Sequence, residues 1–219
     1  MCYILNIETS TKNCSVSLAL YGEIISSREV ADLGYSHAEK LHVFISEVLA
    51  EGAIQISDLS AVAISMGPGS YTGLRIGVAA AKGLCYAASI PLIAVDTMEI
   101  LARQIQVTEG IIVPMIDARR MEVYTATFDK DYNKLKPTQA VIITEDFYAN
   151  EDEKMTLLGD GAIKCEGILN QPQFTILTKA NYPSALQMGN LSYAGFNKNE
   201  FVDIAYFEPF YLKDFYLNK

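Results

Sequence analysis

Two acidic residues directly follow apolar segments that predict β-strands. Glu8 comes after residues 3–7, and Asp117 comes after residues 111–116. A polar turn and a second apolar segment follow in both places, so the two halves of the chain open with strand, acid, turn and strand. A carboxylate at the tip of a strand can hold Mg²⁺ and, through the ion, the phosphates of a nucleotide.

The turn after Glu8 fits a triphosphate poorly. Residues 9–13 include no glycine, so their side chains crowd the place where a phosphate would approach the backbone. Asp160 and Gly161, with Asp117, keep a partial likeness to a second phosphate-binding element. We expect these four residues to be strand-end and turn residues and expect no cofactor, with a nucleotide site as the alternative.

The histidines do not predict a metal site. His37 and His42 are five residues apart, which on a helix places the two imidazoles about 140° apart, whereas zinc pairs use a spacing of four. The chain has no C-x-x-C motif and no G-x-S-x-G motif, and its two histidines make a Ser-His-Asp triad improbable. We expect no metal ligand and no catalytic residue.

The stretch from residue 61 to residue 88 is the most informative part of the chain. Residues 61–64 predict a strand buried on both faces, and Gly67-Pro68-Gly69 predicts a turn. A helix capped by Ser70 or Thr72 should then run to about Ala88. The glycine spacing matches neither the P-loop nor the G-x-G-x-x-G pattern, so we do not expect phosphate binding here.

Glycines inside this predicted helix require an explanation. Each of Gly73, Gly77 and Gly83 costs about 1 kcal/mol relative to alanine. Gly69, Gly73 and Gly77 are spaced by four and, with Ala80 and Ala81, form a stripe of small residues that lets another backbone come close. The pattern fits two neighbours, the sheet of the chain itself or a helix of a partner.

Hydrophobic periodicity predicts the remaining elements. A capping box at Ser36 and Glu39 precedes an amphipathic helix over residues 38–51. A second capping box, at Asp96 and Glu99, opens a helix that reaches about residue 105. The other predicted strands are 14–20, 24–30, 91–95, 122–128, 139–144 and 155–158, and two further helices begin after Gly159 and at Pro183, the latter over residues 183–194.

Composition narrows the function classes. The 219 residues carry 17 Lys and Arg against 26 Asp and Glu, a net charge of −9, so we do not expect the chain to hold nucleic acid on its own. The longest apolar run, residues 83–95, is too short to span a bilayer and contains Pro91. Four cysteines without a disulfide spacing and no visible signal peptide predict a cytoplasmic protein.

Three motifs resemble one known family. The segment S-M-G-P-G-S-Y-T-G-L-R-I-G at residues 65–77 closely resembles the signature of the TsaB (YeaZ) proteins of bacterial tRNA threonylcarbamoyladenosine biosynthesis. D-A-R-R-M-E-V-Y at 117–124 resembles a second element of the family. The tail P-F-Y-L-K at 209–213 resembles a third, with lysine in place of arginine.

The resemblance and the repeated opening of the two halves imply the fold. It is an α/β fold with a duplicated ribonuclease-H-like unit, as in the superfamily of actin, Hsp70 and the sugar kinases. We expect an N-terminal half at residues 1–105 that carries the partner-binding helices, and a smaller C-terminal half at residues 106–219. In that superfamily the acid after the first strand is an aspartate followed by a glycine-containing hairpin, and this chain departs from both features.

The resemblance also implies a role without catalysis. It implies a scaffold that supports a TsaD-like catalytic subunit, with a TsaE-like ATPase as third member, a homodimer when alone, and contact with tRNA only through the complex. TsaD carries an H-x-x-x-H metal pair that this chain lacks. The interface residues that we predict are Leu41, Phe44, Ile45, Tyr71, Gly73, Arg75 and Gly77. The alternatives are an autonomous nucleotide-dependent phosphotransferase or ATPase, and a glycoprotease-like hydrolase.

Overall fold

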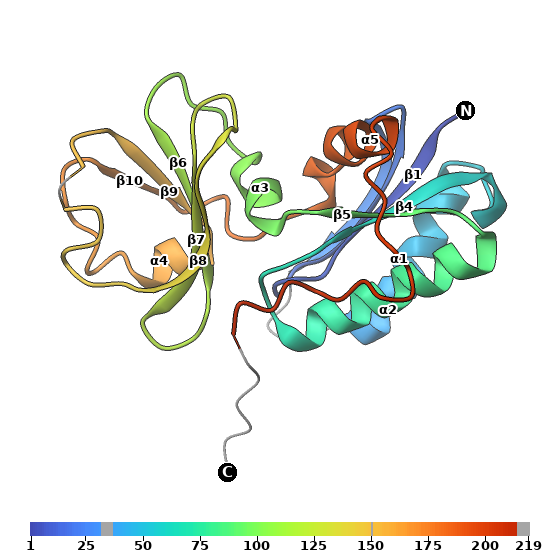
Figure 1. Cartoon of the computed structure of the whole chain (residues 1–219), viewed down its shortest axis with the longest axis horizontal. Coiled ribbons are helices and arrows are strands. Elements are labelled where there is room, and N and C mark those ends of the chain that lie inside the picture. The colour runs from blue at the N-terminus through green and yellow to red at the C-terminus, as the bar shows by residue number, and fades with distance from the viewer. Residues whose placement is uncertain (32–36, 150, 214–219) are drawn as a thin grey trace, which may run out of the picture.

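A computed structural model of the chain describes residues 1–31, 37–149 and 151–213. These residues form two five-stranded sheets that lie side by side, with α3 (Thr97–Ala102) between them (Figure 1). The first sheet has the order β3-β2-β1-β4-β5, with bounds Glu23–Val30, Cys14–Leu20, Tyr3–Glu8, Leu59–Ser65 and Leu92–Val95. The second has the order β8-β7-β6-β9-β10, with bounds Lys134–Ile142, Glu122–Phe128, Ile111–Asp117, Met155–Leu158 and Phe174–Leu177.

The two sheets have the same topology. In the first, β1 pairs antiparallel with β2 and parallel with β4; in the second, β6 pairs antiparallel with β7 and parallel with β9. The parallel pairs β4 with β5 and β9 with β10 complete the correspondence. This repeat confirms the predicted duplicated α/β fold.

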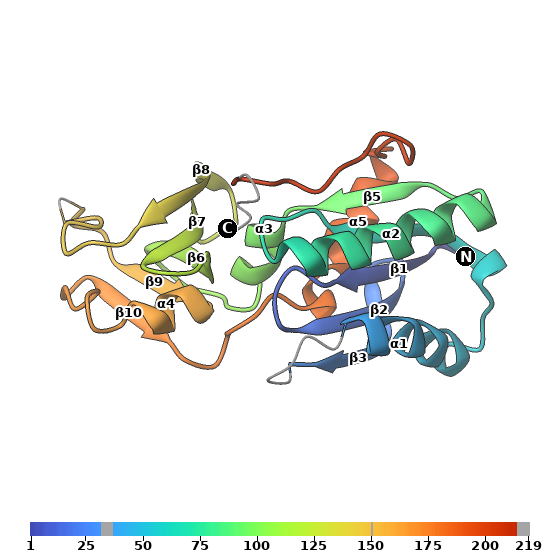
Figure 2. The ribbon, with the colours of Figure 1, turned by 90° about the horizontal axis from the view of Figure 1, so that it is seen from below.

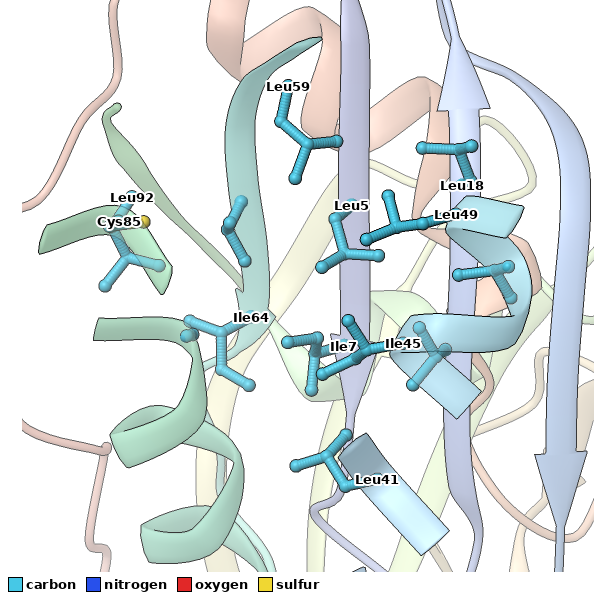
Figure 3. Close-up of a cluster of buried hydrophobic side chains, with 14 of the residues drawn as sticks. Leu5, Ile7, Leu18, Leu41, Ile45, Leu49, Leu59, Ile64, Cys85 and Leu92 are labelled. Carbon is cyan, nitrogen blue, oxygen red and sulfur yellow. The ribbon is translucent and has the colours of Figure 1, made fainter. Parts of the chain in front are cut away.

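Apolar residues at helical spacing determine which helices cover the first sheet. Leu41, Ile45 and Leu49 of α1 (His37–Glu51) point at the sheet and pack next to Leu5 and Ile7 of β1 (Figure 3). The long helix α2 (Tyr71–Ala88) covers the same face beside α1 (Figures 1 and 2). Its N-cap is Ser70, whose hydroxyl accepts a hydrogen bond from the Gly73 amide, as the sequence predicted. The capping box predicted at Ser36 lies outside the described residues.

The opposite face of the first sheet is covered by α5 (Gly189–Asn197), a segment that the sequence prediction places in the second half. Met188, next to η2 (Ala185–Gln187), is buried with Ile4 of β1 and Ile93 of β5. Farther on, the Val202 amide donates to the carbonyl of Leu92. This segment therefore covers the apolar face of the first sheet that α1 and α2 leave open.

Several predicted elements differ in extent. The strand predicted at 139–144 is β8, which begins five residues earlier at Lys134. The helix predicted at 183–194 is η2 followed by α5. Strand β10 was not predicted at all. The second half also contains the short helix α4 (Asp160–Lys164), and no described helix is long and apolar enough to cross a membrane.

Candidate functional site

The glycines of α2 pack against the turn between β1 and β2 of the same chain. A β-carbon on Gly73 would lie 2.1 Å from the carbonyl oxygen of Thr9, and one on Gly77 would lie 2.1 Å from the hydroxyl oxygen of Thr9. At Gly69 the nearest atom would be the carbonyl oxygen of Ser10, at 2.2 Å. Two hydrogen bonds join the same elements: Thr9 Oγ1 donates to the Gly73 carbonyl at 2.8 Å, and the Ser70 amide donates to the Ser10 carbonyl at 2.6 Å.

Gly73 and Gly77 therefore face the turn of the same chain, and a contact of these glycines with a partner stays a prediction. Both glycines are buried, and the space that a side chain would need is filled by the turn. The same packing closes the turn itself, because Thr9 and Ser10 are fully buried and Thr11 is nearly so. A phosphate could reach the backbone of this turn only after α2 had moved away.

Glu8, at the tip of β1, is buried beneath this turn. Its Oε1 accepts a hydrogen bond from the Ser10 amide at 2.5 Å. Burial raises the pKa of Glu8 to about 7, although hydrogen bonding by Ser10 and Ser65 opposes the shift. The carboxyl group ties strand and turn together inside the protein and has no access to solvent.

His37, at the start of α1, is also an internal residue. Its Nε2 lies 2.8 Å from the carbonyl oxygen of Thr11, and burial lowers the pKa of the imidazole. Within the described ranges, no group of three or more His, Cys, Asp or Glu side chains is arranged to hold a metal ion.

The acids of the second half form a junction between β6 and α4. Asp160 Oδ1 accepts a hydrogen bond from the Asp117 amide at 2.9 Å, and Lys164 Nζ lies 2.5 Å from Asp117 Oδ1. Gly161 lies against the backbone of Met115, where a β-carbon would be only 2.9 Å from the carbonyl group. Burial raises the pKa of Asp160 to about 6, although the hydrogen bond from the Asp117 amide opposes the shift. The structure thus brings Asp117, Asp160 and Gly161 together, with the Asp117 charge already paired to a lysine.

Two of the predicted interface residues on α1 lie in the core. Leu41 and Ile45 are buried against the first sheet (Figure 3), so a partner cannot contact them without displacing α1. Only Phe44 of the three residues predicted on α1 is partly exposed. The apolar period of Leu41 and Ile45 thus marks the inner face of the helix, and their contact with a partner stays a prediction.

Tyr71 and Arg75, in contrast, lie at the surface of α2 and are covered in part by the C-terminal segment. The Arg75 guanidinium lies 4.1 Å from the centre of the Tyr71 ring, and this ring is 4.9 Å from the Tyr211 ring. The Phe210 amide donates to the Met66 carbonyl at 2.7 Å, which fixes the segment to the turn before α2. Figure 1 shows this segment, in red, running along α2. Sequence reasoning identified the tail motif but not where it docks.

A second row on α2, made of three small residues and Arg75, is open to solvent. Arg75, Ala79, Gly83 and Ala87 are spaced by four and all are exposed. No atom lies within 4 Å of the position that a β-carbon would take on Gly83. Tyr86, beside this row, is 83% exposed. We call Arg75, Ala79, Gly83 and Ala87 the outer row of α2. The four-residue spacing of Ala79, Gly83 and Ala87 is visible in the sequence, but we predicted the partner contact at the stripe through Gly73 and Gly77 instead.

Comparisons with known proteins agree on one family. A family model described as TsaD, tRNA N6-adenosine threonylcarbamoyltransferase, matches residues 31–210. The tRNA threonylcarbamoyladenosine biosynthesis protein TsaB of Haemophilus influenzae is 30% identical over 96% of this chain and 93% of that protein. The protein of the same name from Escherichia coli is 33% identical over 65% of this chain and 63% of that protein.

Solved structures give the same result for the fold. YeaZ from Pseudomonas aeruginosa superposes with a TM-score of 0.82 at 26% identity, over 97% of this chain and 100% of that one. The ethanolamine utilization protein EutJ of Carboxydothermus hydrogenoformans, at 12% identity and a TM-score of 0.50, shares the fold alone.

Proposed function

The chain belongs to the TsaB (YeaZ) family, and on that premise we propose that it is the non-catalytic subunit of the complex that forms threonylcarbamoyladenosine in tRNA. Its task is to bind and support a TsaD-like catalytic subunit, which transfers the threonylcarbamoyl group to the adenosine beside the anticodon. A TsaE-like ATPase is the third member of the complex. Without its partner the chain forms a homodimer, and it meets tRNA only within the complex.

The outer row of α2 is the observation that carries this proposal. A glycine in mid-helix costs about 1 kcal/mol relative to alanine, and Gly83 makes no internal contact that would offset this cost. Small side chains at a spacing of four allow the backbone of another helix to approach closely. The exposed Tyr86 beside the row adds the kind of large ring that is enriched at protein interfaces. We therefore place the partner surface on the outer row, with Tyr71 and Phe44 at its edges.

The closed turn argues against an autonomous ATPase or phosphotransferase. In the turn that handles phosphate in the actin-like superfamily, Thr9 and Ser10 lie against the glycines of α2 and are fully buried. Asp117, the corresponding acid of the second half, is paired with Lys164. The second alternative, a glycoprotease-like hydrolase, would need side chains that hold a metal ion. The described part of the chain contains no group of three or more His, Cys, Asp or Glu side chains arranged for this purpose.

Reconstitution tests the proposal. The purified chain, a TsaD-like subunit and a TsaE-like ATPase are incubated with unmodified tRNA, ATP and threonylcarbamoyl adenylate, and the modified nucleoside is measured by mass spectrometry. We expect no product from the chain alone and a strong loss of product when the chain is left out of the full mixture.

A surface variant locates the contact. Arg75→Glu should reduce both product formation and association with the TsaD-like subunit, whereas Lys198→Glu, at the end of α5 on the opposite face of the sheet, should change neither. Product from the chain alone, or full activity of the mixture without it, would refute the scaffold role.

A further inference from the structure

A polar cavity opens at the junction of the two halves, away from α2. It has a volume of about 610 Å³, and its lining comes mainly from the turn after β1, the end of β3 and the crossover between β10 and α5. Figure 2 shows this crossover, in orange, running from one sheet to the other. This volume falls within the range of about 300–1,000 Å³ that is usual for small-molecule sites. The polar residues that line the cavity include Glu29, Lys179, Asn181, Ser184 and Gln187.

Glu29 presents a carboxylate that is held in place but not neutralised. Its Oε2 accepts hydrogen bonds from Ser184 Oγ at 2.6 Å, from Asn13 Nδ2 at 3.3 Å and from Ser15 Oγ at 3.4 Å. All three donors are buried and neutral, and Asn13 is itself anchored to the Pro183 carbonyl at 3.1 Å. No cation within the described residues forms an ion pair with Glu29. The carboxylate is therefore fixed in the wall of the cavity with its charge available.

Lys179 supplies the opposite charge on the crossover. It lines the same cavity, and the described part of the chain offers its ammonium group no ion-pair partner. Several other lysines form ion pairs with a carboxylate, as Lys164 does with Asp117. The cavity thus carries one unpaired anion and one unpaired cation.

Asn181 and Gln187 also line the cavity, but their side-chain oxygens Oδ1 and Oε1 are closed off from solvent. The acceptor that a ligand in the cavity can reach is therefore the carboxylate of Glu29. A carboxylate without an ion-pair partner favours a cationic group that brings N–H donors.

We propose that this cavity binds a small zwitterion of the α-amino-acid class. Its ammonium group is bound by Glu29, and its carboxylate is bound by Lys179. The inference does not rest on the proposed scaffold role, because none of these residues lies on α2. Since the cavity walls come from β3 and from the crossover, a bound ligand would also brace the joint between the halves.

Calorimetric titration of the full chain with the twenty standard amino acids tests the proposal, with thermal melting as a second readout. We expect at least one amino acid to bind and to raise the melting temperature. The N-acetyl derivative of that amino acid, which lacks the positive charge, and its carboxamide, which lacks the negative charge, should each bind at least ten-fold more weakly.

Variants place the ligand in the cavity. Glu29→Gln and Lys179→Gln should each weaken binding about ten-fold or more, while the melting temperature without ligand reports that each variant is folded. The matched controls Glu166→Gln and Lys198→Gln carry the same changes at exposed positions outside the cavity and should bind normally. The proposal is overturned if no amino acid binds at a concentration of about 10 mM, which is high enough to reveal a Kd of about 1 mM. It is equally overturned if binding is unchanged in the Glu29 and Lys179 variants, or if nucleosides bind here instead.

Discussion

Glu8 shows how a residue of catalytic type can serve structure alone. In a nucleotide-binding relative of this fold, the acid after the first strand must reach solvent and a metal ion. Here Glu8 is fully buried, and its pKa is raised to about 7 because burial disfavours the charged form. At neutral pH a large fraction of the folded molecules therefore keep the proton on this carboxyl group.

This raised pKa predicts a pH-dependent effect of Glu8→Gln. The unfolded chain loses the proton near pH 4.5 and the folded chain only near pH 7, so the wild type loses stability as pH rises between these values. Glutamine keeps an acceptor for the Ser10 amide and has no proton to lose. Relative to the wild type, the variant should gain on the order of 2–3 kcal/mol between pH 4.5 and pH 8.

Melting curves of both proteins across this pH range measure the effect. Glu166→Gln, the same change at an exposed position, serves as the control. A difference between Glu8→Gln and the wild type that does not change with pH would show that Glu8 has an ordinary pKa.

At the scale of the element, α2 carries two rows of small residues with different roles. The inner row, Gly69, Gly73 and Gly77, lets the helix approach the turn of the same chain. The outer row faces solvent, and Gly83 within it has open space around it. Substitutions to leucine in the two rows should therefore have opposite effects on stability and on association.

Gly77→Leu should destabilise the isolated chain. Its β-carbon would lie 2.1 Å from Thr9 Oγ1, so helix or turn must move. Overpacking typically costs about 1–3 kcal/mol, which for a chain of this size lowers the melting temperature by roughly 4–10 °C. A melting curve measures this, and an unchanged melting temperature would contradict the close packing of α2 on the turn.

Gly83→Leu should leave the isolated chain at least as stable, since leucine has the better helix propensity by nearly 1 kcal/mol. Association with the TsaD-like subunit, or self-association, should weaken about ten-fold or more, because the side chain blocks the approach of another helix. Sedimentation measures this beside Ala194→Leu, an exposed position on α5 that serves as the matched control. Normal association of Gly83→Leu would remove the outer row from the interface.

Local sequence patterns predicted most helices and strands, but they did not predict which neighbour each face of a helix or strand contacts. The glycine turn and the two possible caps, Ser70 and Thr72, predicted the start of α2 to within two residues, because they act within one turn of helix. A period of four residues identifies a row of small side chains, but it does not say whether sheet, turn or partner lies opposite. Strand β10 was missed because four residues carry too little pattern, and the return of α5 to the first sheet depends on contacts between distant parts of the chain.

At the scale of the whole molecule, both sheets keep the topology of the duplicated fold, while the backbone of the first turn is closed to solvent. Residues 9–11 are buried beneath α2, and Asp117 is paired in the second half. We expect titration with Mg-ATP to give no binding stronger than about 1 mM. Micromolar binding with hydrolysis that Asp117→Ala abolishes would instead establish the nucleotide-dependent alternative.

The net charge of −9 bears on how such a chain takes part in tRNA modification. Affinity for nucleic acid depends largely on cations that neutralise phosphates, and it falls steeply with salt. We expect the chain alone to bind tRNA no more tightly than about 10⁻⁴ M at physiological salt, at the weak end of non-specific binding. Adding the TsaD-like subunit should produce binding whose salt dependence comes from that subunit.

Filter binding or anisotropy at several salt concentrations separates the two cases. Since the partner would supply the phosphate contacts, Arg119→Gln in this chain should leave the salt slope of the complex unchanged, although Arg119 is an exposed cation. Submicromolar binding by the chain alone, with a steep salt slope that Arg119→Gln reduces, would place the tRNA surface on this subunit. Its role would then be to hold the substrate and not only to support the catalytic partner.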